Sequence, residues 1–178
     1  MQDASADSLF KSRHNLLFGV RRSIRYHHRR RLFFDRIHKL STILSALSGS
    51  ATIAAVLANA GPVITIVFAA LVAVSSITDL VVGTAQAARL HDDLTRRFID
   101  LEKSIINSKD LTEEVISSLT ARRLDIEADE PPPLKVLDSV CHNELLRAMG
   151  YDKDSEVEIK WYQRLTKQFF DLKEHQIS

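Results

Sequence analysis

The middle of the chain is one long apolar run without a charged residue. Residues 40–78 contain no Asp, Glu, Lys or Arg, whereas charges occur throughout the parts before and after them. A helix rises about 1.5 Å per residue, so 40–58 would extend about 28 Å and 62–82 about 31 Å, each close to the hydrocarbon thickness of a bilayer. Gly61 and Pro62 favour a turn between them. The pattern predicts a transmembrane hairpin over 40–83.

The two halves of this hairpin differ in their side chains. The first half carries several hydroxyl groups, which leaves open a buried hairpin in a soluble bundle, but a helix of such a bundle normally has a charged face and neither half has one. Small residues repeat every four positions in the first half, a spacing that lets helices approach closely in lipid. The predicted packing residues are Ser41, Ser45, Gly49, Ala46, Ser50 and Ala54.

The second half begins with large apolar residues and becomes polar toward its end. Asp79 either lines an aqueous path or lies at the lipid headgroups, because a carboxylate in a span faces protein or water. The predicted pore or interface residues are Ser75, Ser76, Thr78, Asp79 and Gly83.

The remainder of the chain has helical periodicity. After Gly83 there is no Gly or Pro until Pro131, so the second span is predicted to continue as a long helix. Its apolar stripe consists of Leu90, Leu94, Phe98, Leu101 and Ile105. Asp110 and Glu113 have capping-box spacing for a second helix that folds back on this stripe, so that 84–130 forms a helical hairpin. Pro131 to Pro133 end it, and 131–178 is predicted to hold two short helices, 134–149 and 155–173, in a small helical bundle.

Charge is divided unevenly along the chain. Residues 1–39 have ten Lys or Arg and three Asp or Glu, while the chain as a whole has a net charge of +1. This segment is predicted to be a basic helix, and basic residues beside a span stay on the cytoplasmic side, so both termini are expected in the cytoplasm. Contact with anionic lipid is the favoured role, a topology signal alone is the second, and nucleic-acid binding has only a weak signal. The residues concerned are Arg21, Arg22, Arg25, Arg29, Arg30, Arg31, Arg36 and Lys39.

Residues able to support catalysis or hold a cofactor are sparse. The single cysteine, Cys141, excludes an intramolecular disulfide, and its neighbour His142 points about 100° away on a helix, which suits a nucleophile and base poorly. His91, Asp92 and Asp93 lack a second histidine cluster, and no phosphate-binding loop occurs. The sequence predicts a protein without enzymatic activity, metal or cofactor.

The order of segments resembles that of a known superfamily. A basic arm ending RLFFDRIHKL, a small-residue hairpin and AARLHDDLTRRFIDLEKSI together resemble the SLATT superfamily, bacterial two-span proteins. The likeness covers residues 12–125 and is architectural. It implies a membrane effector of antiviral defence at the bacterial inner membrane. Such an effector would be a homo-oligomer that opens a pore or disrupts this membrane when a separate nucleotide-sensing or signalling protein triggers it.

Three functions follow as hypotheses from these features. The first is an all-α, pore-forming membrane effector assembled from several copies of the chain. The second is a non-conducting membrane anchor or adaptor whose helices recruit a cytoplasmic partner. The third is a soluble helical binding module.

Overall fold

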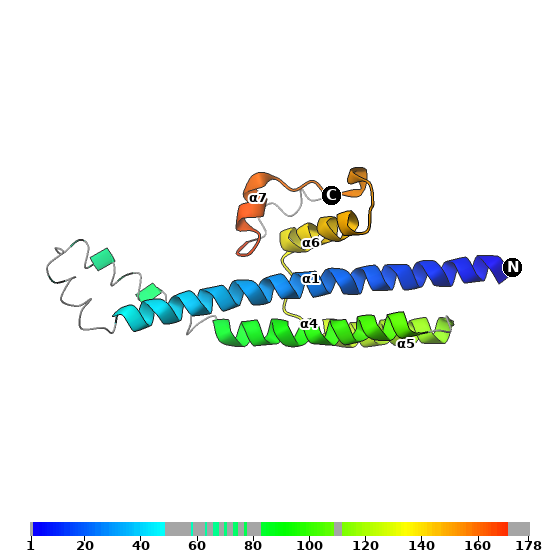
Figure 1. Cartoon of the computed structure of the whole chain (residues 1–178), viewed down its shortest axis with the longest axis horizontal. Helices are drawn as coiled ribbons and strands as arrows, with labels where there is room; N and C mark the ends of the chain where they lie inside the picture. Colours follow the sequence, from blue (N-terminus) through cyan, green and yellow to red (C-terminus); the bar gives the residue numbers. More distant parts are fainter. Residues whose placement is uncertain are drawn as a thin grey trace. The chain divides into compact units, whose positions relative to one another are not determined.

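The computed structural model describes residues 2–48, 83–108 and 112–170, together with single positions between 49 and 82 (Figure 1). These residues form five α-helices and one 3-10 helix and no strand. The helices are α1 (Gln2–Ser48), α4 (Thr84–Asn107), α5 (Glu113–Glu127), α6 (Lys135–Ala148), η1 (Lys153–Ser155) and α7 (Trp161–Thr166). The chain divides into two compact units. Unit 1 comprises Met1–Arg29 and Asp92–Ser178, and unit 2 comprises Arg30–His91.

The main core of unit 1 lies between α1, α4 and α5. The apolar stripe predicted on α4 is confirmed from Leu94 onward, because its last four residues are completely buried, but the prediction is wrong for Leu90, which is 40% exposed. They pack against two residues of α1 and two of α5, which folds back on the stripe as predicted. The cluster consists of Leu16, Val20, Leu94, Phe98, Leu101, Ile105, Leu119 and Ile126.

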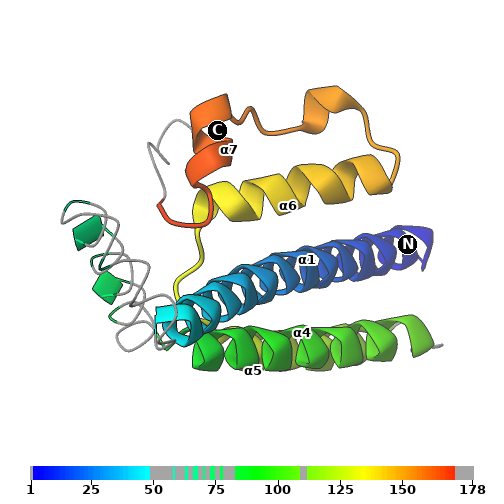
Figure 2. The ribbon, with the colours of Figure 1, turned by 60° about the vertical axis from the view of Figure 1, so that its left-hand side comes forward.

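A second, smaller core of unit 1 lies on another side of α1. In both views α6 runs along one side of α1, and α4 with α5 runs along the other (Figures 1 and 2). Tyr26 of α1 packs on Leu137 and Cys141 of α6. The backbone N–H of Leu134 donates a 2.9 Å hydrogen bond to the Tyr26 hydroxyl. Leu134 supplies the first N–H after three prolines, which have none, so this bond fixes the start of α6.

Unit 1 also buries a histidine between these two cores. His27 is 1% exposed, and its ring stacks on Phe98 at 5.6 Å between centroids. Its Nε2 lies 3.0 Å from Oε1 of Glu130, which sits just before the prolines. The contact ties α1 to the segment between α5 and α6.

Two predicted details of unit 1 are wrong. The N-cap of α5 is Thr112, whose hydroxyl accepts a hydrogen bond from the N–H of Val115, and Asp110 lies outside the described residues. The predicted helix 155–173 is replaced by η1 and the six-residue α7. Between them Val157 bonds through both backbone groups to Asn143, and a residue held in that way cannot make the i to i−4 bonds of a helix.

The predicted transmembrane hairpin is contradicted by the structure. Within the described residues, none of the helices is both long enough and apolar enough to cross a bilayer. The helix α1 is 47 residues long but carries charged side chains over most of its length, and eight of the 24 residues of α4 are charged. The described fold is therefore all-α without a membrane span, and most of 49–82 lies outside it.

The predicted continuity between the second span and α4 is wrong as well. Gly83 has φ +59°, in the left-handed region, and α4 begins at the next residue, Thr84. An α-helix cannot pass through a left-handed residue. The carbonyl of Gly83 accepts the first bond of α4, from the N–H of Ala87 at 2.9 Å.

Candidate functional site: an exposed apolar surface on unit 2

Unit 2 has a well-packed inner face between α1 and α4. Phe34 is 8% exposed, and its ring stacks on His91 at 5.7 Å with the planes 9° apart. The guanidinium of Arg30 lies 4.5 Å from the centre of the Phe34 ring, within the range of a cation–π contact. Nearer the other end, the hydroxyl of Thr84 is 3.4 Å from His38 Nδ1. These contacts fix which side of α1 faces α4.

The opposite side of α1 in unit 2 is apolar and exposed. Leu40, Ile43 and Leu47 are spaced three and four residues apart, so they form one row along the helix. They are 61%, 55% and 50% exposed. Ordinary core residues would be covered, and the inner face shows that α1 can bury its apolar residues where α4 is available. This row has no such cover within the described part of unit 2.

A second row comes from single described positions later in unit 2. Val63, Ile66, Val67 and Ile77 are each helical, and each is between 52% and 72% exposed. Val63, Ile66 and Val67 have a spacing that places them on one face of a helix, and Ile77 is grouped with them because it is exposed to a similar extent. The seven residues of the two rows are called the apolar rows below.

The size of the apolar rows can be compared with that of known interfaces. Burying a Leu or Ile side chain gains about 1.5–3 kcal/mol, and each Å² of apolar surface removed from water gains about 25 cal/mol. Dividing the first value by the second gives an apolar area on the order of 100 Å² for each residue of the rows, and about 700 Å² for all seven. Monomeric soluble proteins rarely expose contiguous patches above a few hundred Å². A standard protein interface buries about 800 Å² per partner. The rows thus offer roughly the area that one interface needs.

The residues predicted for helix packing and for a pore are only partly described. Ser41 is buried at 6% exposure, whereas Ala46 is exposed beside the first row. Gly83 lies at the start of α4 in its left-handed conformation. The side chain of Ser45 and the other predicted residues lie outside the described part of the chain, namely Gly49, Ser50, Ala54, Ser75, Ser76, Thr78 and Asp79.

The basic residues predicted to contact lipid are largely engaged with the protein itself. In unit 1, Arg21 pairs with Glu102 at 2.7 Å, and Arg29 pairs with Glu144 at 2.6 Å. Arg22 lies 3.2 Å from the carboxylate of Asp138.

The remaining basic residues of the arm have more varied surroundings. Arg25 donates to the carbonyl of Arg21 at 3.3 Å. In unit 2, Arg31 lies 3.7 Å from Asp35 on the same helix, while Arg36 and Lys39 are exposed. Four of the eight predicted residues thus pair with carboxylates of the same chain, and the contact of the arm with lipid stays a prediction.

The residues weighed for catalysis lie in packed surroundings. Cys141 is fully buried, and burial raises the pKa of its thiol to about 12. Burial, followed by the positive charge of Arg22, lowers the pKa of His142, whose ring packs edge-on against Phe18. His91 belongs to the packed face of unit 2. Within the described residues no group of three or more His, Cys, Asp or Glu side chains could hold a metal ion.

Comparison with known proteins adds no relative. The chain matches no protein family, no curated protein and no solved structure. The resemblance to the SLATT superfamily consequently rests on the sequence segments alone, and the functional argument rests on the structure of the two units.

Proposed function

We propose that this chain is an effector that acts as a homo-oligomer, assembled through the apolar rows of unit 2. The observation that carries the proposal is the exposure of seven large apolar residues in a unit of about sixty residues. The resemblance to SLATT effectors of bacterial defence supports an oligomeric role, with a separate signalling protein as the trigger.

A second copy of the chain is the occupant that fits the rows best. Together the rows expose about 700 Å² of apolar side chain, close to the 800 Å² that one partner buries in a standard interface. Burying that area would gain on the order of 15 kcal/mol, against roughly 4–15 kcal/mol for the cost of association. The rows also lack charges of their own, so two copies can meet without like-charge repulsion.

Light scattering coupled to size exclusion tests this assignment with two matched substitutions. Leu40 in the first row and Leu124 on α5 are 61% and 60% exposed, so Leu40→Glu and Leu124→Glu make the same chemical change at equal exposure. The unchanged chain and L124E should elute as one oligomer of defined mass. L40E should weaken assembly at least tenfold, because a carboxylate replaces an apolar contact worth about 1.5–3 kcal/mol.

Other occupants of the rows would give different results. A monomeric unchanged chain would contradict the proposal, as would equal weakening by both substitutions. A monomer that co-floats with phospholipid vesicles, and loses this property on L40E but not L124E, would assign the rows to lipid. A broad distribution of masses would mean nonspecific association and would also refute a defined oligomer.

A further inference from the structure

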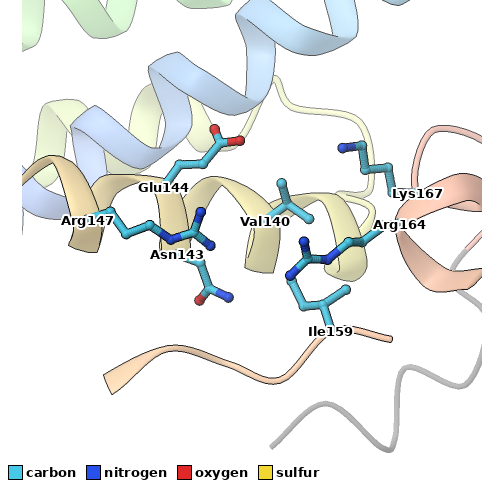
Figure 3. A pocket seen from close by; sticks show the side chains of 7 residues that line it. All are labelled: Val140, Asn143, Glu144, Arg147, Ile159, Arg164 and Lys167. Carbon is cyan, nitrogen blue, oxygen red and sulfur yellow. The ribbon is translucent and has the colours of Figure 1, made fainter. Parts of the chain in front are cut away.

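A small pocket lies within unit 1 between α6 and the segment that ends in α7. Its volume is about 110 Å³ (Figure 3). Val140 and Ile159 supply apolar walls, and Ile159 is 8% exposed. The remaining lining residues are polar or charged, namely Asn143, Glu144, Arg147, Arg164 and Lys167. The pocket therefore combines a fixed apolar wall with a concentration of charge.

The framework of this pocket is held by hydrogen bonds. The side chain of Asn143 donates to the Val157 carbonyl at 2.6 Å and accepts from the Val157 N–H at 2.9 Å. Arg147 pairs with Glu156 through two nitrogens at 2.7 and 2.8 Å. These contacts attach the segment before α7 to α6, so the space between them is formed before any ligand arrives.

The charges around the pocket do not cancel. Glu144 is its one acidic lining residue, and it already accepts a 2.6 Å hydrogen bond from Arg29. Arg147 is neutralised by Glu156. Neither Arg164 nor Lys167 forms a side-chain hydrogen bond or ion pair with any other described residue. The pocket lining thus carries an excess of positive charge, with Glu144 acting on Lys167 only through space.

The arrangement of these two cations suits an anion. In Figure 3 the side chains of Arg164 and Lys167 reach from α7 and its C-cap toward α6. Burial, and then the nearby charge of Arg29, lower the pKa of Lys167, whereas the carboxylate of Glu144 acts in the opposite direction. An anion bound beside Lys167 would stabilise its charged form. A guanidinium and an ammonium that line one pocket can both contact an oxyanion, since the first gives a planar fork and the second a point charge.

The volume limits the size of the anion. A water molecule needs about 10–15 Å³ on this measure, so the pocket accepts a tetrahedral group of five heavy atoms and excludes a large organic molecule. An ester substituent would have to extend into solvent.

We propose that this pocket binds a phosphoryl group through Arg164 and Lys167, either as inorganic phosphate or as the phosphate of a small phosphomonoester. Val140 and Ile159 exclude water from one side of the group, which strengthens its attraction to the two cations. This assignment is independent of the assembly proposed for unit 2, because all of its residues belong to unit 1.

Isothermal titration of the full chain with inorganic phosphate and with glycerol phosphate, at constant chloride concentration, tests the proposal. Saturable binding of either probe at one site per chain is expected. Stronger binding of glycerol phosphate would identify an ester as the ligand, and stronger binding of phosphate would identify the free ion. Absence of saturable binding of both probes overturns the proposal.

Matched variants separate this site from general attraction to a charged protein. R164Q combined with K167Q should weaken binding at least tenfold, whereas R122Q on α5 should change it less than twofold. Equal weakening by R122Q, or unchanged binding in the double variant, overturns the proposal. If the double variant fails to fold, backbone amide shifts in the unchanged chain decide. Phosphate should move the Val157 and Ile159 signals, and shifts confined to other residues would refute the site.

Discussion

The bond between Asn143 and Val157 provides a sharp test of the unit 1 structure. Asn143 is 2% exposed and makes two hydrogen bonds to one residue, at 2.6 and 2.9 Å. Each such bond contributes about 0.5–1.5 kcal/mol, and a buried group left without a partner costs about 1–3 kcal/mol. Val157 is only half-buried, so its two groups can reach water when the segment lifts. Asn143→Ala should therefore cost about 2–3 kcal/mol.

Two measurements check this value. Urea unfolding followed by helical circular dichroism should show a lower midpoint at an unchanged slope. Hydrogen exchange at the Val157 amide should speed up by roughly 30- to 150-fold, since about 1.4 kcal/mol corresponds to tenfold. Ser139→Ala is the control, because its hydroxyl only bonds the carbonyl of Lys135 on the exposed side of the same helix. If N143A and S139A have free energies of unfolding within about 0.5 kcal/mol of each other, the described contact between Asn143 and the Val157 segment is wrong.

Three further results are expected. Cys141 is buried and the pKa of its thiol is raised to about 12, so iodoacetamide should react with it only after denaturation. Rapid alkylation of the native chain would contradict its burial. Burial lowers the pKa of His142, so the folded state holds this proton more weakly than the unfolded state. Stability should therefore fall as the pH drops through about 6.5. The fall in the urea midpoint should be smaller in H142Q than in the unchanged chain. Gly150 has φ +79° and nothing within 4 Å of an added Cβ, so G150A should cost about 1 kcal/mol in thermal unfolding and G150N less; equal values would argue against a left-handed residue.

The sequence predicted the local helical structure of unit 1 well. The stripe from Leu94 to Ile105 repeats at helical spacing, and the structure buries all of it. The end of α6 was predicted from Gly150, which adopts the left-handed conformation that favours glycine there. Both signals lie within a few residues of the structure that they specify, which is why the sequence alone reveals them.

Contacts between distant segments could not be predicted in this way. The partner of Arg21 is 81 residues away, and the partner of Arg29 is 115 residues away. A run of arginines gives no information on whether its charges meet carboxylates of the same chain or an outside surface. The same holds for Arg164 and Lys167, which are ordinary surface residues in the sequence and become a pair only beside α6.

The hairpin shows the opposite difficulty. The absence of charge over 40–78 favoured a transmembrane hairpin, but composition does not determine backbone conformation. Gly83, with its left-handed backbone, breaks the continuous helix that was predicted from the second span into α4. At the described positions of this region, the structure shows that several large apolar side chains of unit 2 are exposed.

The distance between copies tests the assembly of unit 2 most directly. A nitroxide attached at Ala46→Cys, beside the first apolar row, in a chain that also carries Cys141→Ala, should show dipolar coupling between labels of neighbouring copies. Dilution with unlabelled chain should remove this coupling, and L40E should do the same while L124E does not. An uncoupled spectrum for the undiluted chain, at concentrations where it elutes as a single species, would contradict the account.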